Sequence, residues 1–205
     1  MKKIIHFSLF LVIAISIIAC GKSEKQKEAA KEEITYMVDA ANSSVQWTGY
    51  KTTDKVPVKG TFKEINITES KPAATATSSL EGLTFEIPVS SIYSKDSIRD
   101  GKLKKFFFAI MENTLSLKGS FSIKDESHGN VAISMNGLTK DLPFTYEMSK
   151  DTIIINGKMD LNNWGAEEAL GSLHEVCLEL HTGADGISKT WDEVGIEAKI
   201  LTVKK

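Results

Sequence analysis

The stretch LTFEIPV, residues 83–89, places an apolar side chain at every second position. Successive side chains of a β-strand point to opposite faces of its sheet, so this period of two predicts a strand with one buried face. The apolar set of this stretch is Leu83, Phe85, Ile87 and Val89.

The same period recurs along most of the chain after residue 36. It is present in residues 45–47, 58–67, 115–123, 131–135, 142–148, 153–161, 176–180 and 194–200. In the second of these windows the apolar parity slips between Phe62 and Ile65, which predicts a bulge. Eight to ten strands with one apolar face each are typical of antiparallel sheets around one interior, so the predicted fold class is all-β.

Two segments depart from this period. Residues 103–111 place apolar side chains at helical spacing, and Ser97 followed by Asp100 predicts the start of that helix as a capping box. If the sheets close into a barrel, we expect this helix to cover it, with the pair Phe106 and Phe107 closing an open end. A second short helix is predicted at residues 166–170, with Gly171 ending it.

The N-terminus predicts an exported protein. Residues 1–3 are a short basic segment, and the apolar run that follows to residue 19 is shorter than the roughly 20 residues of a spanning helix. The run ends in IIAC and resembles the bacterial lipobox, which implies cleavage before Cys20 and lipidation of that cysteine. Its acyl chains would attach the protein to a membrane. An uncleaved anchor helix with an incidental cysteine is the alternative.

The residues after Cys20 are rich in Lys, Glu and Ala and contain no aromatic side chain before the first strand, so they cannot bury a core. We therefore divide the chain into a signal peptide (1–19), a polar tether (20–34) and an all-β domain (35–205). The expected location is the bacterial cell envelope, where the protein is lipid-anchored at the periplasmic face or the outer surface.

The charge of the chain argues against a nucleic-acid partner. The formal charge of the 205 residues is −2, and loss of Lys2 and Lys3 with the signal peptide makes it −4. A protein that binds a phosphate backbone needs a basic patch, and none is present in the sequence.

The sequence offers little for catalysis or metal binding. His174 and His181 are seven residues apart, so on an unbroken strand they face opposite sides and cannot share a metal. Cys177 is a lone thiol that we interpret as a half-buried strand residue. No nucleophile elbow, phosphate loop or dinucleotide fingerprint is present. We expect no catalytic residue, no metal and no cofactor, and hence a protein that is not an enzyme.

Several motifs, in order, resemble the YceI-like family of bacterial lipid- and polyisoprenoid-binding domains. The matching segments are VD at 38–39, SSVQW at 43–47, GTF at 60–62, IPVSSI at 87–92, RDGKL at 99–103 with Phe106 and Phe107, NGLTK at 136–140 and DLNNWG at 160–165. The chain departs from the family at residues 111–115, and residues 173–191 look like an elaboration of this lineage.

The resemblance implies a lipocalin-like, eight-stranded antiparallel β-barrel with one or two short helices. Its partner would be an extended apolar lipid, isoprenoid or fatty-acid-like, held in the lumen for carriage or sequestration. Two alternatives remain open: a structural or interaction lipoprotein whose barrel is filled by side chains, and an enzyme that acts on a lipid.

Inward parity in mid-strand selects the candidate ligand-binding residues of the lumen. They are Phe85, Ile87, Phe121, Ile133, Met135, Phe144 and Tyr146. Gly119 and Gly157 share this parity and either leave room for a ligand or turn barrel corners. Arg99 is a candidate for the lipid head group, with a salt bridge to Asp100 or another helix neighbour as the alternative.

Overall fold

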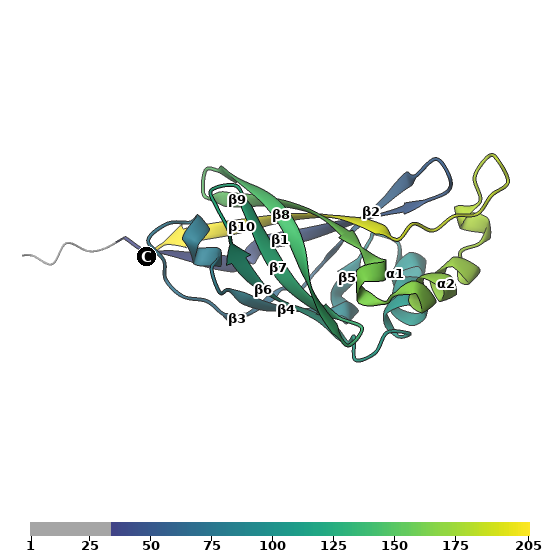
Figure 1. The fold of residues 1–205 in the computed structure, drawn as a ribbon, viewed down its shortest axis with the longest axis horizontal. Coiled ribbons are helices and arrows are strands. Elements are labelled where there is room, and N and C mark those ends of the chain that lie inside the picture. Colours follow the sequence, from purple (N-terminus) through teal and green to yellow (C-terminus); the bar gives the residue numbers. More distant parts are fainter. Residues whose placement is uncertain (1–33) are drawn as a thin grey trace, which may run out of the picture. The chain divides into compact units, whose positions relative to one another are not determined.

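The computed structural model describes residues 34–205 (Figure 1), so the signal segment, Cys20 and nearly all of the predicted tether lie outside the described residues. The described part contains ten strand segments, and every pair of neighbouring strands is antiparallel. The segments are β1 (Tyr36–Lys51), β2 (Val56–Phe62), β3 (Asn66–Glu69), β4 (Thr84–Pro88), β5 (Ile92–Tyr93), β6 (Ser116–Ile123), β7 (His128–Met135), β8 (Leu138–Ser149), β9 (Thr152–Asp160) and β10 (Glu193–Lys204).

These segments close into a barrel of eight continuous strands. The pairing order is β3-β4-β6-β7-β8-β9-β10-β1-β2-β5. β3 continues β2 after a short break, and β5 continues β4 after the 3₁₀ turn η2 (Val89–Ser91). Because β2 pairs with β5 while β3 pairs with β4, the two ends of the order belong to one ladder. The predicted fold class, an eight-stranded antiparallel barrel, is confirmed.

The parity slip between Phe62 and Ile65 marks the break between β2 and β3. The bulge predicted there is thus a kink at which the strand loses regular pairing, although Lys63 N still donates to Ser91 O at 2.9 Å. The bulge within a ladder lies in β1 instead. There the register against β10 shifts between Asp39 and Ser44, and the Ser43 hydroxyl donates to Asp39 O at 2.7 Å.

The first helix starts one residue earlier than the capping box predicts. Asp96 is the N-cap of α1 (Ser97–Leu103), because its carboxylate accepts from the N–H groups of Ile98 and Arg99, each at 3.0 Å. Asp100 is buried and accepts from the Ser94 hydroxyl at 2.6 Å, so it does not serve as the reciprocal residue of a capping box.

The helix continues as the π-helical turn η3 (Lys104–Phe108), where Ala109 N donates to Lys104 O. A π turn widens the spacing by one residue relative to an α-helix. Phe107 and Phe108 therefore both point inward and pack edge to face, with ring centroids 5.0 Å apart, while Ile110 is left exposed. The predicted inward pair Phe106 and Phe107 is corrected to Phe107 and Phe108.

The second helix, α2 (Glu167–Val176), lies where a short helix is predicted at residues 166–170 but is longer, and no strand forms at residues 176–180. Ala169, Leu173 and Cys177 are buried at a spacing of four, so this stripe, rather than the alternation of residues 176–180, governs the segment. Leu178 and Leu180 are exposed. Gly171 lies within the helix with open space around it, so it does not end the helix.

Three 3₁₀ turns complete the described structure: η1 (Thr77–Leu80), η4 (Leu161–Trp164) and η5 (Glu179–His181). The helices α1 and α2 lie at one end of the barrel, whereas the C-terminus lies at the other (Figure 1). Thr35 and Lys205 exchange two backbone hydrogen bonds there. Within residues 34–205 there is no helix long and apolar enough to span a bilayer.

Candidate functional site

The barrel encloses a cavity of about 350 Å³. Its wall is largely apolar and comes from the inward faces of the strands, from α1 and η3, and from the chain after α2. Ligand sites of proteins cover roughly 300–1,000 Å³, so this volume suits a small or slender ligand. Six of the seven predicted lumen residues line it: Phe85, Ile87, Phe121, Ile133, Met135 and Phe144.

Tyr146 is the exception and is not part of the cavity wall. It lies two residues beyond Phe144 toward the end of the barrel that is remote from the helices, and its ring centroid is 6.1 Å from that of Phe144. The Tyr146 hydroxyl donates to Asp125 O at 2.6 Å. Parity gave the correct face for this residue, but Phe144 lies between it and the cavity.

Three aromatic rings form the floor of the cavity. The centroids of Phe85 and Phe121 are 5.5 Å apart, and those of Phe121 and Phe144 are 5.7 Å apart. Such tilted and edge-on contacts are favourable beyond the area that they bury. The floor is therefore a packed aromatic cluster at the end remote from the helices.

Glycines under this floor do not enlarge the lumen in the way that their parity suggests. A β-carbon at Gly119 would come within 2.4 Å of the Phe85 ring, so that ring occupies the space the glycine leaves. The ring of Phe144 covers Gly129 in the same manner. Gly157 does line the cavity, in ordinary contact distance of Leu142.

The roof of the cavity is formed by Leu103, Phe107 and Phe108. Phe108 was missed from the sequence because a regular α-helix turns it away from the apolar stripe, and the π turn brings it back. Trp47 was also missed as a lining residue, although its strand and parity were recognised. Its indole covers Gly60 on β2, and its Nε1 is buried with no hydrogen-bond partner in the described part of the chain.

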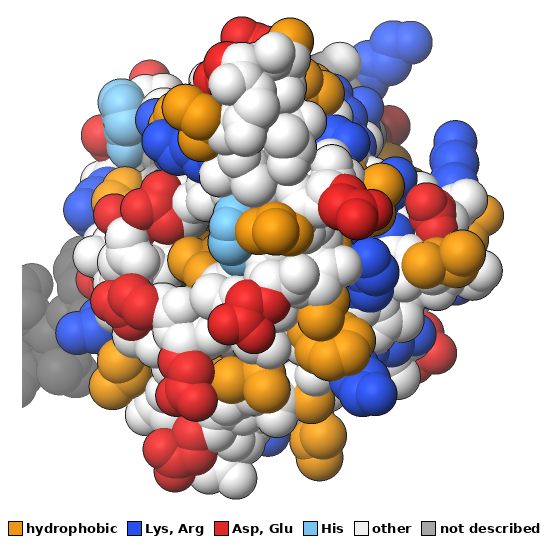
Figure 2. All heavy atoms as spheres, turned by 90° about the vertical axis from the view of Figure 1, so that its right-hand side faces the viewer, with side chains coloured by type: hydrophobic (Ala, Val, Ile, Leu, Met, Phe, Trp, Pro, Cys, Tyr) orange, Lys and Arg blue, Asp and Glu red, His pale blue; other side chains and the backbone are white. Residues whose placement is uncertain are grey.

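Polar groups gather where the cavity meets the helices. The charged lining residues are Lys51, Asp96, Arg99 and Lys102. Seen from outside, this end of the molecule carries hydrophobic side chains scattered among acidic and basic ones (Figure 2). The head group of an amphiphilic ligand would have to be held here, because the rest of the wall is apolar.

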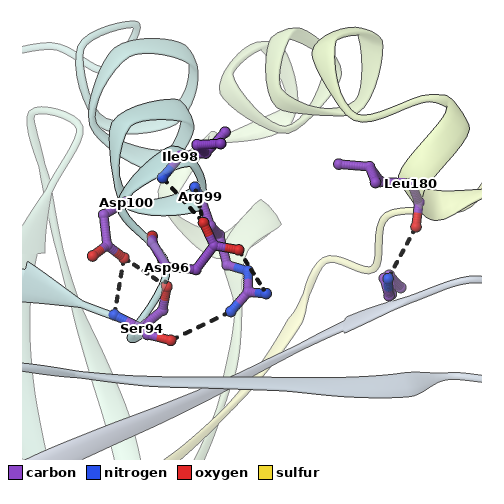
Figure 3. Close-up of polar contacts among 7 residues, drawn as sticks. Ser94, Asp96, Ile98, Arg99, Asp100 and Leu180 are labelled. Carbon is purple, nitrogen blue, oxygen red and sulfur yellow. Dashed lines mark hydrogen bonds and ion pairs between the residues drawn. The ribbon is translucent and has the colours of Figure 1, made fainter.

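Arg99 is bound by Asp96, the N-cap of its own helix, and by Ser94 just before it. Its guanidinium lies 3.4 Å from the Asp96 carboxylate and 3.5 Å from Ser94 O (Figure 3). The N–H of Arg99 also donates to Asp96 and is the main reason that the pKa of this carboxyl lies below its usual value. The salt-bridge partner is thus Asp96 rather than Asp100, and Arg99 is largely engaged.

Among the residues that the structure describes, Lys51 and Lys102 donate hydrogen bonds only to carbonyl groups. Lys51 Nζ donates to Leu180 O at 3.1 Å, a bond drawn at the labelled Leu180 in Figure 3. Lys102 Nζ donates to Val176 O at 2.6 Å. Within residues 34–205, neither ammonium group lies within 4.0 Å of a carboxylate.

The two histidines at this end lie close together, contrary to the prediction from an unbroken strand. His174 Nδ1 and His181 Nδ1 contact the Thr190 hydroxyl at 3.0 and 2.6 Å. They can do so because α2 and η5 replace the strand. Burial, then Lys51, His174 and Lys102, lower the pKa of His181 to about 4. In the described part of the chain, no three His, Cys, Asp or Glu residues are grouped to hold a metal.

Cys177 lies at the C-terminal end of α2 and lines the cavity, so its predicted place in a strand is wrong. Burial raises the pKa of its thiol, although the nearby cations Lys102, Lys51 and Arg99 oppose this. A thiol with a raised pKa is a poor nucleophile at neutral pH.

Sequence comparison agrees with this geometry. The model of the YceI-like domain matches residues 36–201, which is the whole barrel from the first residue of β1 to near the end of β10. The chain belongs to the YceI-like family. Among curated proteins, no relative matches its sequence.

Two solved structures have a similar YceI-like fold. A polyisoprenoid binding domain from Saccharophagus degradans, implicated in plant cell wall breakdown, aligns with a TM-score of 0.59 and 12% identity over 83% of this chain and 98% of its own. BcnA of Burkholderia cenocepacia aligns with a TM-score of 0.51 and 18% identity over 81% of this chain and 99% of its own. At these identities the likeness concerns the fold.

The segment 173–191 of this YceI-like chain supplies much of the polar end of the cavity. It contributes the lining residues Leu173, Cys177, Leu180, His181, Thr190 and Trp191. It also provides the carbonyl groups that receive Lys51 and Lys102. This segment thus shapes the mouth of the cavity, the polar end next to the helices, rather than the barrel wall.

Proposed function

We propose that this YceI-like protein binds an extended apolar lipid, isoprenoid or fatty-acid-like, in the cavity of its barrel and holds it for carriage or sequestration. The apolar cavity carries the proposal. Phe85, Phe121 and Ile133 face inward and are nevertheless only partly buried, because they border empty space instead of packed side chains. A lipid tail in this space would remove their surface from water, at about 25 cal/mol per Å² of apolar area.

A structural neighbour supports the same ligand class, since the domain from Saccharophagus degradans is described as polyisoprenoid-binding. The alternative is an interaction module with a filled barrel, and the open cavity favours the carrier over it. We propose no reaction: the lining is apolar, the one thiol in it has a raised pKa, and YceI-like proteins are binding proteins.

We further propose that the protein is a lipoprotein of the bacterial cell envelope, attached through Cys20 at the periplasmic face or the outer surface. The support is the signal-like run of residues 1–19 and the lipobox-like sequence that ends it. A carrier fixed to a membrane remains close to a source of its apolar ligand.

Native mass spectrometry of the full chain, purified from membranes in mild detergent, tests lipid binding directly. A lipid adduct is expected for the wild type and is lost in Met135→Arg, because Met135 is buried in the wall and a charge there opposes an apolar tail. Leu138→Arg is the matched control, since Leu138 is 42% exposed and does not line the cavity.

Uptake of a radiolabelled polyprenol from phosphatidylcholine vesicles gives the quantitative version of the same comparison. A folded Met135→Arg protein that takes up the polyprenol as well as Leu138→Arg would contradict luminal binding. Wild-type protein that neither carries a lipid adduct nor takes up the polyprenol would favour the interaction module.

A further inference from the structure

We propose that the mouth of the cavity selects lipids with an anionic head, a phosphate or a carboxylate, which Lys51 and Lys102 bind together. The inference rests on the proposed lipid-binding function and specifies the head-group class of the ligand. It follows from the positions, the partners and the surroundings of the two ammonium groups.

The two lysines come from distant parts of the chain and meet at one place. Lys51 is the last residue of β1, and Lys102 lies in α1. Both line the cavity and both are half-buried. Their carbonyl partners lie four residues apart: Val176 is the last residue of α2, and Leu180 follows the helix. The fold thus aims two cations at the same edge of the cavity.

Each ammonium group keeps donors for a ligand. An ammonium carries three N–H donors, and within the described residues each of the two lysines makes one hydrogen bond to a protein group. A carbonyl dipole satisfies a donor but does not neutralise the charge. In residues 34–205, no carboxylate is within ion-pair distance of either lysine.

The acidic side chain that lines the cavity is engaged by groups other than the two lysines. Asp96 is the one acidic side chain among the lining residues of the described chain. Its carboxylate already accepts the N–H groups of Ile98 and Arg99 and pairs with the Arg99 guanidinium. The lysine charges therefore remain uncompensated at the edge of an apolar space, where the cost of a charge is reduced by an opposite charge nearby.

The neighbouring titratable groups respond to the same positive field. After burial, Lys51 and Lys102 are among the causes that lower the pKa of His181. The same two lysines, with Arg99, favour the thiolate of Cys177 against the larger effect of burial. Both directions agree with the hydrogen bonds that bring the two lysines to the chain segment around Val176 and Leu180.

An anionic head at this point completes the arrangement. Its oxygens accept the remaining ammonium donors, and its tail continues into the apolar cavity. Hydrogen bonds to charged groups are stronger than those between neutral groups, so an anionic head is expected to bind at least about tenfold more tightly than a neutral head on the same tail. A phosphate and a carboxylate share this chemistry.

The test compares lipids that share one tail and differ in the head group. Full-length protein in mild detergent is equilibrated with phosphatidylcholine vesicles that contain a prenyl monophosphate or the matching prenyl alcohol, and in a second arm a fatty acid or the matching fatty alcohol. The bound fraction is measured as a function of lipid concentration. A preference of at least about tenfold for either anion over its alcohol supports the inference, and the arm with the larger ratio identifies the head.

The variant Lys51→Gln with Lys102→Gln is expected to reduce that ratio to below about threefold, because binding of the anionic lipid weakens towards that of the alcohol. Lys59→Gln with Lys105→Gln is the charge-matched control: both lysines are exposed and outside the cavity wall, and this double variant keeps the wild-type ratio.

The two proposals fail in different ways. Equal affinity of the wild type for an anionic lipid and its alcohol, in both arms, overturns the head-group inference and leaves lipid binding intact. The inference is also overturned if the double variant of Lys51 and Lys102 keeps the wild-type ratio of affinities for the anionic lipid and its alcohol. If none of the four lipids binds to the wild type, the proposed function itself fails.

Discussion

The ring of Phe85 on β4 occupies the space above Gly119 on β6, the residue paired with it in the barrel wall. A β-carbon at residue 119 would approach the ring to 2.4 Å and the carbonyl oxygen of Ala132 to 3.1 Å. The glycine therefore decides where the ring lies, and the ring forms part of the cavity floor. The cavity depends on this pair as much as on the residues that face it.

Replacing Gly119 by alanine tests this relationship. The added methyl group clashes with the ring and lies tightly against the Ala132 carbonyl oxygen, so we expect a loss of about 1–3 kcal/mol in the free energy of unfolding, as for other overpacked sites. Denaturant titration measures it. Gly171→Ala is the control, because its surroundings are open and a helical alanine stabilises by about 0.5–1 kcal/mol. Equal stability of Gly119→Ala and the wild type would contradict the tight approach.

Phe107→Ala tests the roof of the cavity. Phe107 is 7% exposed and packs against Phe108, so its truncation is expected to cost about 3–5 kcal/mol in the free energy of unfolding. Ile110→Ala, three residues further along and 42% exposed, is expected to cost less than about 1 kcal/mol. Similar losses for both variants would place the inward face of this segment elsewhere.

Acidification is expected to destabilise the fold partly through His181. Its pKa is about 4 in the folded protein, below the usual 6.5, so between these values the unfolded chain binds a proton that the folded protein does not. This contribution to stability is complete above about pH 6.5 and is lost as the pH falls to about 4. His181→Gln removes it, so the denaturation midpoint of the variant falls less over this range. If the denaturation midpoints of the wild type and His181→Gln change with pH in parallel, His181 is not the group responsible.

Cys20→Ser tests the proposed anchor. Without the thiol no acyl chain can be attached, so we expect the variant to lose lipid-dependent processing and retention in the membrane fraction. Fractionation with immunoblotting and metabolic labelling with a radioactive fatty acid measure both effects. Cys177→Ser is the matched control, because it removes the other cysteine and leaves the anchor unchanged. Labelling that persists in Cys20→Ser would disprove the assignment.

The strands were predictable from local pattern because each strand buries one face, whereas their closure into an eight-stranded barrel was expected from the family resemblance. Alternation at Phe85 and Ile87 reports that burial within a few residues. Alternation misled at residues 176–180, where the spacing of Ala169, Leu173 and Cys177 governs the structure. The kink between β2 and β3 was visible only as a slip of parity, since its cause is the closure of the barrel by strands distant in sequence.

The candidate site was predictable only in its apolar part. Parity selected six residues of the wall but could not tell that Tyr146 lies below Phe144. The polar mouth has no local signature, because Lys51 and Lys102 meet only in the folded protein. The inward position of Phe108 depends on a π turn, and no residue pattern in the sequence predicts that turn.

The distribution of the tryptophans supplies an optical reporter. Of the three in the chain, Trp47 and Trp191 line the cavity. Trp164 lies outside the cavity wall, is 1% exposed, and donates from Nε1 to Ile133 O at 2.9 Å. A ligand that fills the barrel changes the surroundings of the first two indoles and leaves the third as an internal reference. Intrinsic fluorescence therefore follows loading and release of the barrel in real time, without a label on either the protein or the lipid.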